Sequence, residues 1–174
     1  MGAIPYYIGY FTMYNYWGFT DQIPQTIFIL NTRKSGKKVI GNVKYEAVKI
    51  DQRKYFGVQR VIIEDEEVRI SDKERTLVDL VYKPIGSFDN VRKTLKDSLG
   101  KIDLKKFIGY LTRFPVVSVR KRAGFILEDI GYESQLLRKL KWSLENDRTY
   151  VVLDPMVKSR KGKIDNEWKI IVNR

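Results

Sequence analysis

The spacing of hydrophobic residues changes at Ser71, and this change limits the fold more than any other feature. Before Ser71, apolar and polar residues alternate in short segments, which is typical of half-buried β-strands. After Ser71, apolar residues recur every three or four positions, which is typical of amphipathic helices. Strands followed by a block of helices predict an α+β fold with a curved mixed sheet.

Strands are predicted at both ends of the chain. The first set comprises residues 26–31, residues 39–50 with a break near Gly41 and Asn42, and a hairpin of 58–64 and 67–70 with an acidic turn at Asp65 and Glu66. Two more strands, 149–154 and 167–172, flank a basic loop at 158–163. The pattern leaves open whether these last strands complete the first sheet or form a separate hairpin.

Between the two sets of strands, residues 71–148 are predicted to form an inserted helical block. Ser71 and Glu74 have the spacing of a capping box, in which two side chains satisfy the free backbone N–H groups at a helix start. Asp103 is expected to be the N-cap of a later helix. After the helix that begins near Ser71, four more are expected at residues 88–99, 104–114, 117–130 and 133–144.

The segment from Thr12 to Pro24 predicts a short aromatic helix, a turn and the start of a strand. Thr12 is expected to cap the helix, Gly18 to end it in the left-handed conformation, and Pro24 to keep the chain extended before strand 26–31. Packing of a helix-to-strand corner explains these residues better than contact with a ligand, because stripes of aromatic residues usually lie in a core.

Composition excludes several kinds of chemistry. Cysteine and histidine are absent, so disulfides, Cys/His zinc sites and Cys- or His-based nucleophile systems are not available to this chain. The formal net charge of +12 indicates a nucleic acid or an acidic protein as partner, with a merely solubilising charge as the alternative. No apolar stretch approaches the roughly 20 residues that span a bilayer, and no secretory signal is present, so we expect a cytoplasmic protein without a membrane partner.

Four short blocks, which occur in a fixed order, together resemble the C-terminal domain of AbiEi-type antitoxins. The first, Trp17-Gly18-Phe19-Thr20-Asp21-Gln22-Ile23-Pro24, is similar to the family's hydrophobic-Gly-hydrophobic-Thr-x-Gln-x-Pro entry. Residues 71–79 contain its Glu-[Lys/Arg]-[Ala/Thr]-Leu-x-Asp helix, and residues 119–127 contain its Arg-x-Gly-[Phe/Tyr]-x-Leu helix. The tail, residues 166–173, is similar to the family's terminal strand.

The resemblance implies that residues 1–174 are one antitoxin domain of an AbiE-type system, a type IV toxin–antitoxin system that acts in abortive infection and phage defence. Such antitoxins neutralise a nucleotidyltransferase-like toxin encoded beside them and, with a DNA-reading domain, repress their own operon. Family members usually begin with a winged helix-turn-helix. We expect it to be absent here, because none can be placed before Tyr6. The fold that the resemblance implies is a degenerate restriction-endonuclease-like one.

That fold also raises a nuclease as an alternative function. Ser71, Glu74 and Asp79 could surround a magnesium ion, and Glu167 and Lys169 form a Glu-x-Lys pair on a predicted strand. A helix cap and an ion pair within the helix explain the first three residues more simply. We therefore predict that the chain is not an enzyme, with no catalytic residue, no metal and no cofactor.

The candidate binding residues are cations in the helical block. Arg120 and Lys121 are expected to face solvent, opposite the buried side of helix 117–130. Several cations on one face would hold DNA or RNA phosphates or an acidic toxin surface, and a solvated helix face is the alternative. The basic turn 33–38 and loop 158–163 are secondary candidates, and no aromatic platform for single strands is predicted. The alternative function is a nucleic-acid-binding transcriptional regulator without a toxin. The predicted set is Lys105, Lys106, Arg113, Arg120, Lys121 and Arg122.

Overall fold

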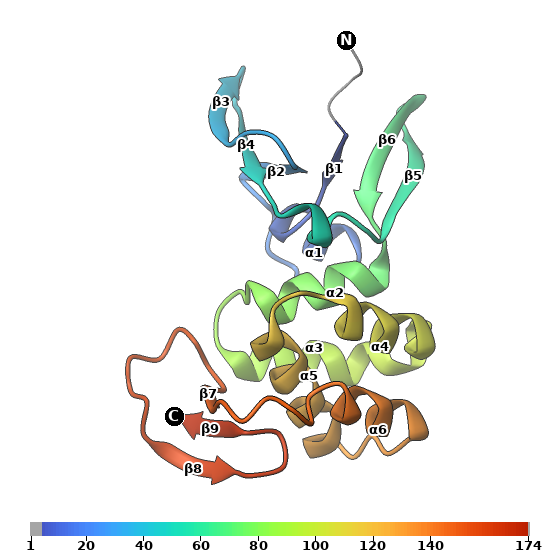
Figure 1. The fold of residues 1–174 in the computed structure, drawn as a ribbon. Coiled ribbons are helices and arrows are strands. Elements are labelled where there is room, and N and C mark those ends of the chain that lie inside the picture. The colour runs from blue at the N-terminus through green and yellow to red at the C-terminus, as the bar shows by residue number, and fades with distance from the viewer. Residues whose placement is uncertain (1–4, 174) are drawn as a thin grey trace. The chain divides into compact units, whose positions relative to one another are not determined.

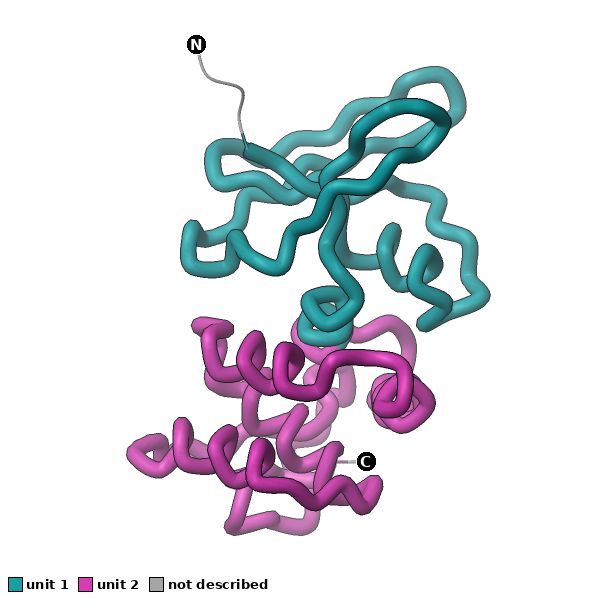
Figure 2. Tube along the Cα trace, turned by 90° about the vertical axis from the view of Figure 1, so that its right-hand side faces the viewer, with its two compact units in different colours: residues 1–80 teal, residues 81–174 magenta. Residues whose placement is uncertain are grey.

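The computed structural model describes residues 5–173 and divides into two compact units, residues 1–80 and 81–174 (Figures 1 and 2). Unit 1 contains a six-stranded sheet, and unit 2 contains most of the helices and a three-stranded sheet. The predicted α+β class with a mixed sheet is therefore confirmed. Within the described residues, no helix is both long and apolar enough to cross a membrane.

The sheet of unit 1 is mixed because its strands pair in both directions. The strand order is β3-β4-β2-β1-β6-β5. Neighbouring pairs β1–β2, β3–β4 and β5–β6 are antiparallel, whereas β2–β4 and β1–β6 are parallel. Two hairpins therefore form the two edges of the sheet. The strands are β1 (Tyr6–Ile8), β2 (Thr26–Asn31), β3 (Gly36–Ile40), β4 (Val43–Lys49), β5 (Val58–Ile63) and β6 (Glu66–Ser71), and a 3₁₀ turn, η1 (Gln52–Lys54), follows β4.

The N-terminal corner contains helix α1 (Phe11–Tyr16), which is followed by β2. Thr12 lies inside α1 and does not cap it: its hydroxyl donates to Thr26 O (3.2 Å) and accepts from Phe28 N (2.9 Å). The predicted cap is wrong, because this hydroxyl serves strand β2 instead of the helix start. Gly18, with φ of 71°, ends the helix as predicted, and Phe19 N donates to Tyr14 O in the way of a Schellman turn.

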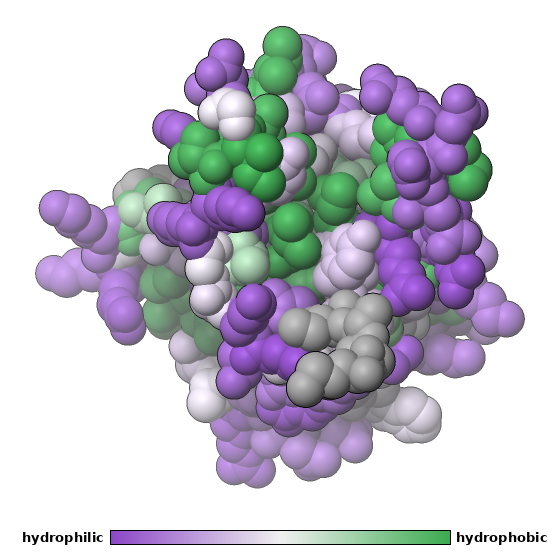
Figure 3. Space-filling view, turned by 90° about the horizontal axis from the view of Figure 1, so that it is seen from above, coloured by the Kyte–Doolittle hydropathy of each residue, from purple (hydrophilic) through white to green (hydrophobic). Residues whose placement is uncertain are grey.

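The predicted strand 39–50 is in fact a hairpin, β3 and β4, which turns at Gly41 with φ of 58°. In the other hairpin, the two turn residues with positive φ are Glu64 and Asp65, one position earlier than predicted. Both hairpins carry exposed apolar side chains, and Figure 3 shows hydrophobic residues over each of them. The exposed apolar residues are Val39, Ile40 and Val43 in one hairpin and Ile62 and Ile63 in the other.

The helices of unit 2 follow the predicted order. Asp103 caps α4 by accepting a hydrogen bond from Lys106 N (3.0 Å), as predicted. Ser134 caps α6 through a hydrogen bond from Leu137 N, so α6 begins two residues after the predicted start. Helix α2 (Lys73–Tyr82) runs across the boundary between the units. The others are α3 (Phe88–Ser98), a 3₁₀ turn η2 (Leu99–Lys101), α4 (Leu104–Arg113), α5 (Val117–Asp129) and α6 (Gln135–Trp142).

The last strands form a sheet of their own within unit 2, which decides between the two arrangements that the sequence left open. Its order is β7-β9-β8, with β7 parallel and β8 antiparallel to β9. Part of the predicted basic loop is strand, because β8 begins at Gly162. The strands are β7 (Val151–Val152), β8 (Gly162–Asp165) and β9 (Ile170–Asn173).

Candidate functional site

Two of the six predicted binding cations, Lys121 and Arg122, are buried and do not face solvent. Lys121 is 0% exposed, and its ammonium donates to Asp147 Oδ1 (2.8 Å), Thr149 O and Thr149 Oγ1. Arg122 Nε donates to Val152 O (3.0 Å). The prediction that this part of α5 offers a cationic face is wrong, because both side chains hold the C-terminal segment onto the helix.

The electrostatics of these two residues agree with a structural role. The hydrogen bond from Lys121 lowers the pKa of the Asp147 carboxyl well below its ordinary value, and the Thr149 hydroxyl and backbone N–H act in the same direction. Burial lowers the pKa of the Arg122 guanidinium, and the charge of Asp154 partly opposes that effect. A phosphate would have to displace Asp147 to reach Lys121.

The other four predicted cations do not form a single cluster around α5. Lys105 and Lys106 are exposed in the first turn of α4, and Arg113 is exposed in its last turn. Eight residues of helix place these ends about 12 Å apart along the axis. Arg120 is half-buried, with Nη1 donating to Ser143 O (3.4 Å). The structure therefore keeps three exposed cations of the predicted set, at the two ends of α4.

A cavity of about 640 Å³ opens elsewhere in unit 2, and we call it the α6 groove. Its walls come from α6, the segment 144–150 and the turn 166–169. Five lining residues are cationic and three are acidic, which leaves a formal charge of +2. The charged and aromatic lining residues are Lys121, Arg138, Lys141, Trp142, Glu145, Asp147, Arg148, Tyr150, Glu167, Trp168 and Lys169.

Three cations of the α6 groove, Arg138, Arg148 and Lys169, lack an ion-pair partner among residues 5–173. Lys121 pairs with Asp147, and Lys141 pairs with Glu167, so these charges compensate one another. Arg138 is exposed, and neither it nor Arg148 forms an ion pair among residues 5–173. Both guanidiniums can therefore meet a ligand without first breaking an ion pair.

Two exposed aromatic rings line the same groove. Trp142, the last residue of α6, is 74% exposed. Tyr150 is held in place, because its hydroxyl donates to Asn166 Oδ1 (2.7 Å) and the Lys169 ammonium lies 5.4 Å from its ring centroid. Lys169 has φ of 56°, a left-handed conformation that is uncommon for a side chain of this size. The groove thus has one ring fixed by its neighbours, Tyr150, and one solvent-exposed ring, Trp142, together with its cations.

The Trp168 indole lies between the α6 groove and helix α5. It is 1% exposed, Nε1 donates to Glu128 Oε2 (2.7 Å), and the Lys141 ammonium lies 5.5 Å from the ring centroid. Gly124 allows this packing, because a Cβ at that position would lie 2.0 Å from Trp168 Cζ3. Gly124 from the Arg-x-Gly block and Trp168 from the tail therefore pack directly against each other.

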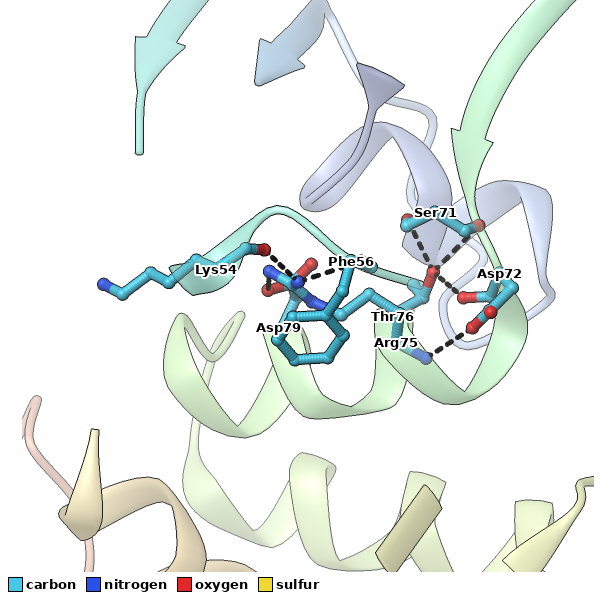
Figure 4. A network of polar contacts seen from close by, with 7 residues as sticks. All are labelled: Lys54, Phe56, Ser71, Asp72, Arg75, Thr76 and Asp79. Carbon is cyan, nitrogen blue, oxygen red and sulfur yellow. Dashed lines mark hydrogen bonds and ion pairs between the residues drawn. The ribbon is translucent and has the colours of Figure 1, made fainter. Parts of the chain in front are cut away.

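Two residues of the nuclease alternative, Ser71 and Asp79, belong to a buried polar network in unit 1 (Figure 4), and Glu74 is buried at the start of the same helix, α2. Arg75 and Asp79 form an ion pair (Nη2 to Oδ1, 2.9 Å) with side chains 1% and 0% exposed. Arg75 Nη1 also donates to Lys54 O (2.5 Å) and Phe56 O (3.2 Å). The network therefore joins α2 to the segment between β4 and β5, and it gives Asp79 a cationic partner from its own helix.

The start of α2 differs from the predicted capping box. Asp72, and not Ser71, accepts the hydrogen bond from Arg75 N (2.8 Å). The Ser71 hydroxyl instead lies 2.8 Å from the Thr76 hydroxyl. Asp72 is the better acceptor for this position, because a carboxylate also interacts favourably with the positive end of the helix dipole.

Burial of this network affects the tyrosines around it. The pKa of Tyr7, which is 0% exposed, is raised by burial first and by the charge of Asp79 second. Burial is the largest influence on the pKa of Arg75 and acts to lower it, but the charges of Asp79 and the nearby tyrosines and the hydrogen bond to Asp79 together raise it. The raised pKa of Arg75 agrees with its role in a buried ion pair.

The second nuclease candidate is not on a strand. Glu167 and Lys169 lie in the turn before β9, which begins at Ile170, so the predicted Glu-x-Lys strand position is wrong. Glu167 is paired with Lys141. Among residues 5–173, no three acidic side chains gather in a way that could hold a metal ion.

No protein-family model matches this sequence, and no curated protein is significantly similar to it. Among solved structures, the chain is similar to the crystal structure of the RV2827C protein from Mycobacterium tuberculosis, with a TM-score of 0.62 and 14% sequence identity. The likeness covers 95% of this chain but only 61% of that one, so this chain spans less than two thirds of its neighbour. At this identity the match shows a shared fold and nothing about shared activity.

The α6 groove was not predicted from the sequence, although the sequence contains one signal for it. Leu137 and Leu140 define the buried side of α6. At 100° per residue, Trp142 lies about 200° beyond Leu140 and therefore on the opposite side of the helix. An outward tryptophan next to Arg138 was therefore readable from the helical pattern. The walls formed by Arg148, Tyr150 and the turn 166–169 were not, because they depend on the sheet.

Proposed function

We propose that this chain is a non-catalytic antitoxin of the AbiE type, which neutralises a nucleotidyltransferase-like toxin encoded beside it. The resemblance of the four sequence blocks supports this proposal. Residues from these blocks, including Arg75, Asp79, Arg122, Gly124 and Trp168, are used for ion pairing and packing. A family signature made of framework residues fits a binding module better than it fits an enzyme.

The observation that carries the proposal is the α6 groove, where Arg138 and Arg148 lack ion-pair partners within the described part of the chain. Exposed cations without an ion-pair partner favour an anionic partner. The partner would be an acidic surface of the toxin or the nucleic acid on which the toxin acts. The exposed cations of α4, Lys105, Lys106 and Arg113, add a second surface with the same preference.

The test is growth rescue in cells that express the neighbouring nucleotidyltransferase together with this chain. The groove variant carries Arg138→Glu, Arg148→Glu and Lys169→Glu. The matched control carries three reversals in the exposed loop before β8, at Lys158, Arg160 and Lys161, so that both variants have the same net charge.

We expect the parent and the control to rescue growth and the folded groove variant to fail. Failure of the parent, with the protein present and folded, would refute the antitoxin proposal for this chain. Equal rescue by all three proteins would support the antitoxin proposal but would show that the α6 groove is not the surface that neutralises the toxin.

A nucleic-acid-binding regulator without a toxin is the second candidate, and the exposed ring of Trp142 beside two arginines favours it. This function predicts binding to nucleic acid that weakens steeply with salt, together with no effect of the chain on the toxicity of its neighbour. The rescue experiment therefore separates the two candidates.

A further inference from the structure

The α6 groove combines features that suit one class of ligand. Its volume of about 640 Å³ lies within the range of roughly 300–1,000 Å³ that is usual for pockets that enclose a small ligand. Trp142 and Tyr150 offer ring faces, and Arg138 and Arg148 offer guanidiniums. A ligand with flat rings and regularly spaced negative charges would use both.

We propose that the α6 groove binds a segment of single-stranded nucleic acid, with a base stacked on Trp142 and the adjoining phosphates on Arg138 and Arg148. The inference rests on the proposed function, because it names what that interaction surface holds. Bases of a single strand are free to stack on aromatic side chains, whereas the bases of a duplex are already stacked on one another.

The exposure of Trp142 is the strongest single argument for this ligand. A tryptophan is large and mostly apolar, and one that is 74% exposed leaves most of its ring in water. Tyr150 is different, because its bond to Asn166 and its contact with Lys169 fix the ring before any ligand arrives. The groove therefore has a fixed wall at Tyr150 and a ring at Trp142 that a base would cover.

The charges favour a nucleic acid over an acidic peptide. Carboxylates of a peptide would be satisfied by the two arginines alone and would leave the ring of Trp142 exposed. A nucleotide covers the ring and reaches a guanidinium with the same molecule, since base and phosphate are joined through one sugar. The paired charges Lys121–Asp147 and Lys141–Glu167 keep the rest of the lining nearly neutral.

The experiment measures binding of the intact chain, without any toxin, to labelled unstructured oligonucleotides of about ten nucleotides. Fluorescence anisotropy would compare RNA, DNA of the same sequence and the corresponding duplex. The aromatic variant is Trp142→Ala, and its control is Tyr16→Ala, since Tyr16 is an exposed ring in unit 1. The charge variant is Arg138→Gln with Arg148→Gln, and its control is Arg160→Gln with Lys161→Gln.

We expect Trp142→Ala to weaken binding by roughly 5- to 150-fold, which is the usual effect of removing one stacked ring. Tyr16→Ala should leave binding within about 2-fold of the parent. Loss of two phosphate contacts should reduce the slope of log affinity against log salt by about 1.4. Equal affinity for RNA and DNA supports recognition through base and phosphate, and a preference for RNA also supports the site while adding a contact to the 2′-hydroxyl.

The inference would be overturned if the parent does not bind, if Trp142→Ala and Tyr16→Ala have equal effects, or if the duplex binds more tightly than the single strand. Competition by polyglutamate as strong as that by the oligonucleotide would also overturn it, in favour of an acidic peptide. Because no toxin is present in the binding experiment, a lack of oligonucleotide binding would not refute the antitoxin proposal, which the rescue experiment tests separately. Binding of the oligonucleotide without rescue of growth would refute only the proposal that the chain is an antitoxin.

Discussion

Replacing Gly124 by alanine should destabilise the protein, although the same change in a helix normally stabilises it. Gly124 lies within α5, where alanine has a helix propensity about 1 kcal/mol better than glycine. The added Cβ, however, would lie 2.0 Å from Cζ3 and 2.4 Å from Cε3 and Cη2 of Trp168. Carbon atoms in contact are usually about 3.5–4.0 Å apart, so the indole must move by roughly 1.5 Å.

The size of the effect follows from what holds the indole. Trp168 is buried and is fixed by its hydrogen bond to Glu128, so a shift weakens that bond as well as the packing. Overpacking a core by one methyl group costs about 1–3 kcal/mol, and loss of a hydrogen bond adds about 1 kcal/mol. After the gain in helix propensity is subtracted, we expect Gly124→Ala to lower the free energy of unfolding by about 2 kcal/mol.

Urea denaturation of the parent and variants measures this difference. The matched control is Gly109→Ala in α4, since Gly109 is exposed and a Cβ there would meet nothing within 4 Å. That control should raise the free energy of unfolding by about 1 kcal/mol. In a Trp168→Leu background, the penalty of Gly124→Ala should largely disappear. A parent-like or stabilised Gly124→Ala protein would refute the reasoning.

Four further predictions concern charged side chains. Arg75→Leu and Asp79→Leu should each lower the free energy of unfolding, measured in urea, by about 3–5 kcal/mol, because each leaves one buried charge unpaired. The double variant should lose less stability than the sum of the two single variants. Asp147→Asn should destabilise more than Lys121→Met, because it leaves a buried ammonium without its anion whereas Asp147 can be hydrated; equal costs would contradict this. Folding lowers the pKa of Asp147, so this carboxylate stabilises the folded protein fully above its unfolded pKa of about 3.9. The stabilisation is lost as the pH falls toward the folded pKa. Urea denaturation of Lys121→Met and the parent over a series of pH values would reveal this loss. Lys169→Gly should raise the free energy of unfolding by about 0.5–1 kcal/mol, because glycine adopts a φ of 56° without strain, and a loss of stability would show that the contact with the Tyr150 ring outweighs the backbone term.

Local signals predicted the elements whose ends are set by neighbouring residues. Strand β2 occupies residues 26–31 as expected, and the Asp103 cap places the start of α4 correctly. Where a side chain serves a distant partner, local patterns failed. Thr12 has the right type for a cap but bonds to residues 14 and 16 positions away. Strand β8 was missed because its residues are mostly exposed and lack an apolar pattern.

The candidate site was harder to predict for the same reason. Lys121 was expected to face solvent and Arg122 to bind a partner, yet their own partners lie 26 to 30 residues further along the chain. Long aliphatic stems allow such side chains to be buried when the charged end finds acceptors. The basic character of unit 2 was evident from composition, but the α6 groove required the arrangement of α6 with the turn 166–169.

The enclosure of Lys121 has a consequence for chemical labelling. Amine-reactive reagents should acylate exposed lysines such as Lys158 quickly, whereas Lys121 is fully covered and bonded to Asp147 and Thr149. Its modification requires the segment around Asp147 to detach from α5, so the reaction rate follows the frequency of that local opening. Mass spectrometry of partially acylated protein would thus turn one buried lysine into a gauge of how tightly the wall of the α6 groove is closed.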